Sequence, residues 1–324
     1  MTTVLTKIQI EKAGQFIGHE GAIFTLEPAH DAYLFYSGSS DNLVVEWNIK
    51  EQEQNKVIAR LPAKAMALKY IPDRNILLVG QSAGGIHVID LNKNEEIKLL
   101  QLHRLSIYDI QYLPEEECFW AVAGDGTLSV WSINDFSLIA SLKLCDKKIR
   151  SIDFNIILKE AAIGCGDGSI RIFDFETFVE KKILKGHVDD FSVNTVRYHP
   201  NGKYLLSGSR DAHLNVWDIE NDYALIHHIP AHNYAIYSIV FSPDKNLFAT
   251  GSRDKTIKIW DARLNDGVGQ AQNFELLLRI DKSQHGGHTH SVNKLLWSIF
   301  NNYLISTGDD KAIMVWKIVQ YDTH

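Results

Sequence analysis

Histidine, a hydroxyl residue and aspartate recur together at four places in the sequence, each time ahead of a tryptophan. The four sets are His19, Ser37, Asp41 and Trp47; His187, Ser207, Asp211 and Trp217; His232, Thr250, Asp254 and Trp260; and His288, Ser306, Asp310 and Trp316. Serine, histidine and aspartate together can form a catalytic triad, in which the histidine takes the proton of a nucleophilic hydroxyl. An enzyme needs one nucleophile rather than four copies of it, so the repetition favours a structural role.

The spacing of these sets indicates a repeated structural unit. A large apolar residue closes each unit, and these residues are Trp47, Ile89, Trp131, Phe173, Trp217, Trp260 and Trp316. The gaps between them are 42, 42, 42, 44, 43 and 56 residues. A period of this size is typical of folds in which each repeat is one supersecondary unit.

The segments around these residues are also similar to one another. Ser207–Asp218 and Thr250–Asp261 align residue by residue, and Gly-His or a relative precedes each set, as at Gly18-His19 and Gly186-His187. With these motifs the chain resembles the WD-repeat β-propeller family over essentially its whole length. The resemblance implies that each Asp, His, Ser or Thr, and Trp set forms a buried hydrogen-bonded tetrad. It also implies that partners bind the narrower top face around the central channel.

The repeat predicts an all-β fold, a single seven-bladed propeller of four-stranded antiparallel blades. We expect blades at approximately residues 15–60, 61–101, 102–143, 144–185, 186–230, 231–286 and 287–324, the last with residues 3–11. In blade five the expected strands are 192–199, 203–209, 214–219 and 223–229. Too few residues follow Trp316 for a fourth strand, so we predict that Val4–Ile10 becomes the outer strand of blade seven and closes the ring.

Blades two to four depart from the tetrad pattern. Blade three keeps His103, Asp125 and Trp131 but has Ala121 where the hydroxyl belongs. In the other two blades the tetrad positions hold Cys145, Ile163, Asp167 and Phe173 in blade four, and Leu61, Val79, Ala83 and Ile89 in blade two. We expect apolar packing to replace the tetrad in these blades.

Two positions in each blade are expected on the top face. The first lies five residues after the histidine anchor, or seven in blade five, and gives Phe24, Met66, Tyr108, Arg150, Asn194, Tyr237 and Asn293. The second precedes the turn aspartate and gives Ser40, Ser82, Gly124, Gly166, Arg210, Arg253 and Asp309. Aromatic residues, methionine and arginine are enriched at the centres of protein interfaces.

We therefore predict a partner-binding site made by Phe24, Met66, Tyr108, Arg150, Arg210, Tyr237 and Arg253. An apolar arc beside a basic arc would suit a peptide or loop with hydrophobic and acidic side chains. The alternative is that these side chains fill the channel mouth, and that Arg210 and Arg253 neutralise the turn aspartates.

Two other segments are weaker candidates. The segment between Trp260 and His288 is the longest between blades, and residues 262–273 are expected to form a Gly-rich polar loop that could be a partner arm. His285, His288 and His290 resemble a metal cluster, but His288 belongs to a tetrad and no carboxylate or thiolate accompanies the others. We predict no metal, no cofactor and no catalytic residue.

Composition limits the remaining classes of function. The net charge of −7 argues against a general nucleic-acid or anionic-membrane binder. The three cysteines lack metal-ligand spacing, and their odd number suits free thiols in a reducing compartment. There is no signal-peptide pattern and no long apolar run, so we expect a soluble, cytoplasmic protein.

The sequence thus predicts a non-catalytic scaffold, itself monomeric, that binds a protein or peptide on its top face. A specificity or assembly subunit of a larger enzyme complex is the first alternative. An enzyme in its own right is the second, although it would need reactive groups at the channel mouth beyond the tetrads.

Overall fold

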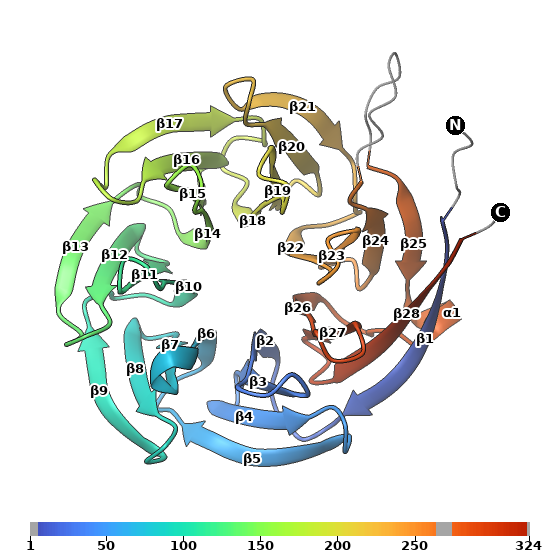
Figure 1. The fold of residues 1–324 in the computed structure, drawn as a ribbon, viewed down its shortest axis with the longest axis horizontal. Coiled ribbons are helices and arrows are strands. Elements are labelled where there is room, and N and C mark those ends of the chain that lie inside the picture. The colour runs from blue at the N-terminus through green and yellow to red at the C-terminus, as the bar shows by residue number, and fades with distance from the viewer. Residues whose placement is uncertain (1–5, 264–273, 323–324) are drawn as a thin grey trace.

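The computed structural model describes residues 6–263 and 274–322, which form seven four-stranded antiparallel sheets around a central channel (Figure 1). Blade one contains β2 (Ile23–Pro28), β3 (Leu34–Ser39), β4 (Leu43–Asn48) and β5 (Glu53–Arg60). Blade two contains β6 (Ala65–Ile71), β7 (Ile76–Gln81), β8 (Gly85–Asp90) and β9 (Glu95–Gln101), with the short 3-10 helix η1 (Pro72–Arg74) between β6 and β7. Blade three contains β10 (Ile107–Leu113), β11 (Cys118–Ala123), β12 (Thr127–Ser132) and β13 (Leu138–Lys143).

The remaining blades repeat this order. Blade four contains β14 (Ile149–Asn155), β15 (Glu160–Cys165), β16 (Ser169–Asp174) and β17 (Glu180–Lys185). Blade five contains β18 (Val193–Tyr198), β19 (Tyr204–Ser209), β20 (Leu214–Asp218) and β21 (Ala224–Ile229). Blade six contains β22 (Ile236–Phe241), β23 (Leu247–Ser252), β24 (Ile257–Asp261) and β25 (Leu276–Ile280), and one turn of helix, α1 (Lys282–His285), follows it. Blade seven contains β26 (Val292–Trp297), β27 (Tyr303–Gly308), β28 (Ile313–Asp322) and β1 (Thr6–Phe16).

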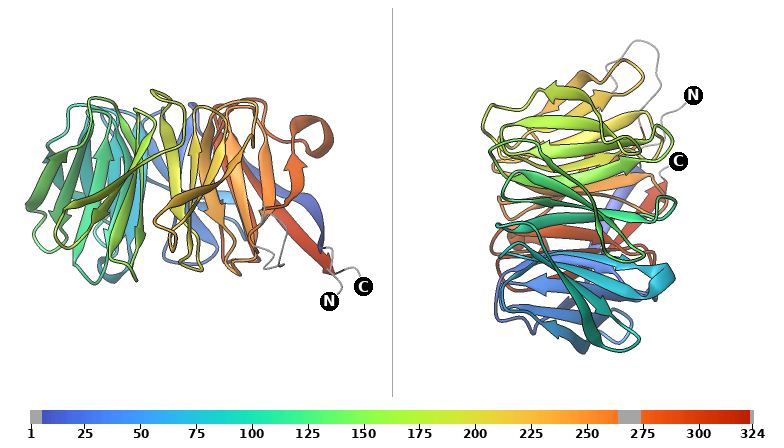
Figure 2. Two further views of the ribbon diagram at one scale, coloured as in Figure 1. Left: turned by 90° about the horizontal axis from the view of Figure 1, so that it is seen from above. Right: turned by 90° about the vertical axis from the view of Figure 1, so that its left-hand side faces the viewer.

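The prediction of a seven-bladed propeller is confirmed, and in blade five each strand end lies within one residue of its predicted place. The first strand of each blade lines the channel and the fourth lies at the rim (Figure 1). Seen from the side, the ring is a flat disc, and α1 lies on the opposite side of it from the start of β1 and the end of β28 (Figure 2). Among the described residues, no helix has the length and apolar character needed to cross a membrane.

Seven apolar clusters hold the ring together, and each one joins two neighbouring blades. Leu205 and Leu206 are consecutive residues of β19, and both are fully buried. Leu205 packs in the cluster shared with blade four, whereas Leu206 packs in the cluster shared with blade six. Successive side chains of a strand point to opposite faces of the sheet, so this second strand is buried on both faces.

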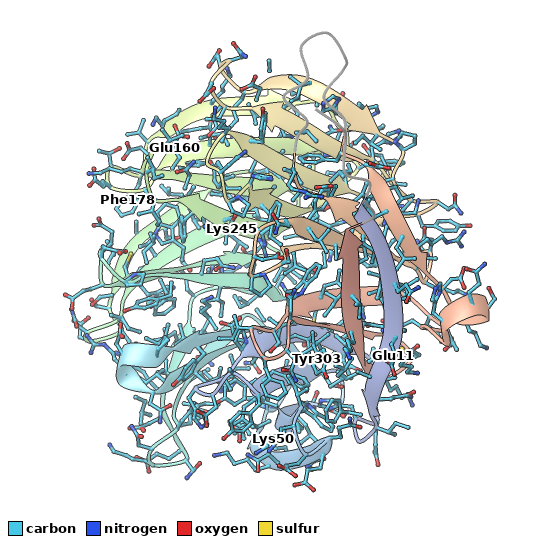
Figure 3. The ribbon with its side chains drawn as sticks, turned by 45° about the vertical axis from the view of Figure 1, so that its right-hand side comes forward. Glu11, Lys50, Glu160, Phe178, Lys245 and Tyr303 are labelled. Carbon is cyan, nitrogen blue, oxygen red and sulfur yellow. The ribbon has the colours of Figure 1, made fainter. Side chains whose placement is uncertain are left out.

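The N-terminal strand closes the ring, as predicted, by pairing with β28 in an antiparallel register that includes Ile10 opposite Ile318. It is longer than predicted, because β1 continues through a bulge between Lys12 and Gly14 to Phe16. Val4 and Leu5, the first residues of the predicted strand, lie outside the described residues. Figure 3 shows β1, with Glu11 labelled, running along the rim of the ring. Ile8 and Ile10 pack against the cluster shared by blades six and seven.

We expect an Ile8→Ala/Ile10→Ala variant to have a lower melting temperature than the wild type, because it removes apolar contacts that hold β1 on the last blade. The matched control is Gln9→Ala/Glu11→Ala, which changes the two exposed neighbours on the same strand. Circular dichroism during heating measures both. Equal melting temperatures for the two double variants would contradict a closing role for β1.

Candidate functional site

The inner strands of all seven blades open at the top face into one cavity of about 310 Å³. All seven residues of the first predicted position line this cavity: Phe24, Met66, Tyr108, Arg150, Asn194, Tyr237 and Asn293. Each is the second residue of its inner strand, where the strand register skips one residue. Such a bulge leaves one residue out of the ladder and re-aims its side chain. Of the second predicted position, only Asp309 lines the cavity.

Three arginines on this face each lie over an aromatic ring. The guanidinium carbon of Arg150 is 4.4 Å from the ring centre of Tyr108. The corresponding distances are 5.3 Å from Arg210 to Phe191 and 5.8 Å from Arg253 to Tyr234. Stacking of this kind restrains the side chain while its N–H groups stay available in the plane of the guanidinium. Among the described residues, no ion pair joins Arg210 or Arg253 to a turn aspartate, which is the contact that the alternative interpretation needs.

The two asparagines of the ring have a structural contact instead. Asn194 donates from Nδ2 to the carbonyl oxygen of Ile236, and Asn293 donates to that of Ile23, both at 3.0 Å. Each bond connects its blade to the next one around the ring. Asn293 also donates to Asp309 at 2.8 Å. Filling of the channel mouth therefore describes Asn194, which is buried, whereas Asn293, the aromatic residues, Met66 and Arg150 remain partly exposed.

Positive charge gathers on the side of blades four and five. Burial, together with the positive charges of Arg150 and Arg210, lowers the pKa of Lys148. The Nε atom of Arg150 is buried and has no hydrogen-bond partner among the described residues. This side of the cavity is thus locally cationic although the whole chain has a net charge of −7.

The floor of the cavity contains charged residues that the sequence analysis did not select. Asp109, Arg197 and Lys294 line it. Burial lowers the pKa of Lys294 even though Asp109 acts in the opposite direction. The only sequence signal for these residues is a charge within an inner strand. Asp109 and Lys294 directly follow the residue of the first predicted position in their strands, and Arg197 lies three positions after it.

The four predicted tetrads have one common geometry. In blade five, His187 Nδ1 is 2.9 Å from Asp211 Oδ2, His187 Nε2 is 2.8 Å from Ser207 Oγ, and Trp217 Nε1 donates to that oxygen at 2.9 Å. The corresponding distances in the other three tetrads, made by His19, His232 and His288, lie between 2.7 and 3.0 Å. Because the indole donates to the hydroxyl, the hydroxyl donates to the imidazole and the imidazole donates to the carboxylate. Every tetrad hydroxyl is fully buried, so it cannot reach a substrate.

Comparison with known proteins gives the same picture. The family described as WD domain, G-beta repeat, matches residues 11–48, 178–218, 223–261 and 281–317. This is a WD40-repeat protein. The four matched segments end in the third strands of blades one, five, six and seven, which are the four WD40 blades with complete predicted tetrads.

Individual relatives are distant and longer than the matched region. An uncharacterized WD repeat-containing protein of Schizosaccharomyces pombe is 26% identical over 216 residues, which is 63% of this chain and 56% of that protein. Eukaryotic translation initiation factor 3 subunit I of Coccidioides immitis is 24% identical over 203 residues, 62% of this chain and 52% of that protein. Human pre-mRNA-processing factor 17 is 26% identical over 214 residues, which is 63% of this chain and 36% of that protein. The match thus spans less than two thirds of each relative.

The structure corrects the interpretation of WD40 blade three. Its tetrad is complete, because Ser129 on β12 supplies the hydroxyl that Ala121 on β11 lacks. Ser129 Oγ is 2.8 Å from His103 Nε2 and accepts from Trp131 Nε1 at 2.8 Å, while His103 Nδ1 lies 3.4 Å from Asp125. Ser129 and Ala121 face each other across the two strands, so either position can hold the oxygen. A serine two residues before the closing tryptophan was the available signal.

Apolar side chains occupy the corresponding places in WD40 blades two and four. Val79 and Ile89 are buried in the cluster between blades one and two, and Ile163 and Phe173 are buried in the cluster between blades three and four. Ile89 lies opposite Leu77, as Trp47 lies opposite Phe35 in blade one. Asp167 is the tetrad residue that blade four keeps. It accepts hydrogen bonds from the backbone N–H and the hydroxyl of Ser169.

Neither of the weaker candidates gains support. Of the predicted loop 262–273, residues 264–273 lie outside the described residues. In the part of the chain that is described, no three metal-ligating side chains come together.

We expect Ser129→Ala to lower the free energy of unfolding by about 1–3 kcal/mol, because it leaves the Trp131 N–H and the Nε2 atom of His103 buried without a partner. Ser141→Ala is the control, since Ser141 lies opposite Ser129 on β13 but is exposed. Urea unfolding measures both. Adding Ala121→Ser to the Ser129→Ala variant should recover part of the loss, and no difference among these variants would contradict the assignment.

The tetrads predict a pH dependence of stability. Burial lowers the pKa of His19, His103 and His232 despite their aspartate partners. The unfolded chain therefore binds more protons below about pH 6.5, and the melting temperature should fall as the pH decreases from about 7 to 5. For Asp211, burial raises the pKa, but His187 and two backbone N–H groups outweigh it and lower the pKa to about 2. Stability from this carboxylate is lost between about pH 4 and pH 2. A melting temperature that rises as the pH decreases from 7 to 5 would contradict the lowered pKa of the tetrad histidines.

Proposed function

We propose that this WD40-repeat protein is a non-catalytic scaffold that binds an extended acidic segment of a partner protein across its top face. The observation that carries the proposal is the set of three arginines, each over an aromatic ring, beside the cavity. Restrained guanidinium groups lose little conformational freedom when they bind carboxylates, and they can do so with two parallel hydrogen bonds.

The same face supplies a place for apolar side chains of the segment. Phe24 and Met66 line the cavity on blades one and two, away from the basic side on blades four and five. Leu105, Val188 and Tyr234 are exposed in the loops that precede the inner strands of blades three, five and six, by 53%, 51% and 59%. A segment with a carboxylate and a large apolar residue could bind the arginines with the first and pack against these apolar side chains with the second.

The second candidate is an assembly subunit of a larger complex, and the name of one of the two relatives, which says that it is a subunit, favours it. One is a subunit of a translation initiation factor and the other is a pre-mRNA-processing factor. All three cysteines are free, which supports a reducing compartment, and we place the protein in the cytoplasm. Gel filtration of a native extract, followed by mass spectrometry of co-purifying proteins, separates a free scaffold from a stable subunit.

We expect a library of random displayed peptides, selected on the purified chain, to yield sequences that combine Asp or Glu with a large apolar residue. Binding should weaken as salt is added, because exposed charges are screened. An Arg150→Glu/Arg210→Glu variant should lose the selected peptides.

The control for that experiment is Lys203→Glu/Lys245→Glu, which changes the net charge by the same amount on blades five and six. Both lysines are exposed and lie in turns after the inner strands, at the opposite face, and Lys245 is labelled in Figure 3. Circular dichroism shows whether each variant is folded. Retained binding by the folded arginine variant, or equal loss in both variants, would overturn the proposal.

A further inference from the structure

The face of the disc opposite the candidate site, the bottom face, has a second cavity that the proposed function does not use. It lies where the inner strands β2, β6 and β10 of blades one to three end, and its volume is about 800 Å³. η1, which follows β6, lies on this face, on the same side of the disc as the start of β1 and the end of β28 (Figure 2). A cavity of this size is large enough to hold a long side chain and part of the segment that carries it.

Rigid apolar side chains form the walls of this cavity. They are three prolines at or just after the ends of the inner strands and two tyrosines, each the penultimate residue of its strand: Pro28, Pro72, Pro114, Tyr70 and Tyr112. The Tyr70 hydroxyl donates to Asn75 Oδ1 at 3.0 Å, whereas the Tyr112 hydroxyl has no hydrogen-bond partner among the described residues. A tyrosine offers a flat apolar ring together with a polar end, so Tyr112 can contact a ligand with both.

The charges around the cavity are mostly negative. The three chain segments that surround it, residues 27–31, 69–74 and 112–117, contain six acidic residues and two strongly basic ones. Both basic side chains are already paired with carboxylates. Lys69 Nζ lies 3.2 Å from Glu27 Oε1, and Arg74 Nη2 lies 3.8 Å from Glu117 Oε1. The remaining carboxylates are therefore an excess of negative charge.

Three of these carboxylates are exposed, and no ion pair joins them to a basic side chain in the part of the chain that the structure describes: Asp73, Glu115 and Glu116. The negative charge also acts on the walls. Burial raises the pKa of Tyr112, and Asp73 acts in the same direction although Arg74 opposes it. Burial raises the pKa of Tyr70 as well, and there Asp31 adds to the effect. A cation in the cavity would therefore be attracted from both sides.

An exposed apolar turn lies next to this acidic region, on blade four. Ile156, Ile157 and Leu158, between β14 and β15, are exposed by 49%, 86% and 40%. Their neighbour Lys159 has a raised pKa because of its hydrogen bond with Glu176, and Glu116 of blade three contributes to that rise. Three consecutive exposed apolar residues are unfavourable in water, and such patches mark sites of contact with other molecules.

We propose that this cavity is a second docking site, which takes a basic segment of a partner protein and holds one of its lysine or arginine side chains. The methylene groups of that side chain pack against the proline and tyrosine walls, as the stems of long basic side chains do on apolar surfaces. Its charged end lies between the carboxylate of Asp73 and the ring of Tyr112, which both attract a cation. A large apolar residue of the same segment packs against Ile157.

The two faces of the disc then differ in the sign of the segment that they select. The top face carries the cations Lys148, Arg150 and Arg210, whereas the bottom face of blades one to three carries unpaired carboxylates. Two partners could thus bind at once, one on each face. The inference goes beyond the proposed function and does not depend on it.

The experiment selects a library of random displayed peptides on the full chain and groups the recovered peptides by charge. We expect one group to combine Lys or Arg with a large apolar residue. Fluorescence anisotropy then measures the binding of these basic peptides. Asp73→Lys/Glu115→Lys should weaken it at least about tenfold, because like charges then face each other. Arg150→Glu/Arg210→Glu should leave it unchanged, which separates this site from the top face.

The matched control is Glu220→Lys/Asp222→Lys, which makes the same change of charge in the exposed turn between β20 and β21, on the bottom face of blade five. A further measurement uses the wild-type chain, so it does not depend on whether a variant folds. A carbodiimide with glycine ethyl ester modifies exposed carboxylates, and mass spectrometry locates them. A bound basic peptide should protect Asp73 and leave Asp222 as reactive as before.

Three results would overturn the inference. The first is a selection that yields no basic group of peptides. The second is an equal loss of binding in the two lysine variants, which would mean attraction by the net charge alone. The third is a carboxylate of Asp73 that reacts equally fast with and without the bound peptide.

Discussion

The structure depends on the burial of each sheet between two neighbours. A four-stranded sheet with two apolar faces cannot cover itself, and here every blade shares one apolar cluster with the preceding blade and one with the following blade. Such an arrangement is complete only when the last blade meets the first. The pairing of β1 with β28 satisfies that condition with strands from both ends of the chain, and Phe16 at the end of β1 packs in the cluster between blades seven and one.

The tetrads are a second layer of stabilisation, added at one end of the blades. Blades two and four form the same four-stranded sheet with apolar residues at the tetrad positions, so the sheet itself does not require the tetrad. What the tetrad adds is a connection between the loop that carries the histidine, the turn that carries the aspartate and the second and third strands. In blade one, for example, Asp41 accepts from the N–H groups of Glu20 and Leu43 as well as from His19. These loops and turns also carry Arg210 and Arg253 and the aromatic residues beneath them, so the tetrads fix the backbone from which this part of the candidate site projects. Arg150 lies on β14 of blade four, which lacks a complete tetrad.

The sequence was sufficient for the ring, the strand order and the position of the mouth residues, because all of these repeat with the chain. It was insufficient where the structure departs from the repeat or joins separate segments. Ser129 was missed because the hydroxyl came from the strand opposite the expected one, a substitution that preserves the place of the oxygen in space but not in sequence. Phe191 and Tyr234 were missed as partners of the arginines because they lie in loops, where no alternation of apolar and polar residues marks them. Lys294 and Asp109 line the same cavity from blades seven and three, and their charges interact across the channel.

The proposed binding of a partner segment depends on the differences among the seven blades. Seven equivalent bulges direct side chains of five residue types to the cavity mouth, and an identical set would give a partner seven equivalent orientations. Asparagine at two of these places is used to connect blades, which leaves five side chains for recognition. Of these, the cation at Arg150 lies beside Lys148 and Arg210, while the acidic Asp309 lines the cavity from blade seven. The proposed acidic segment would therefore meet a positive potential on one side and a negative one on another, and this difference would select one direction for its chain.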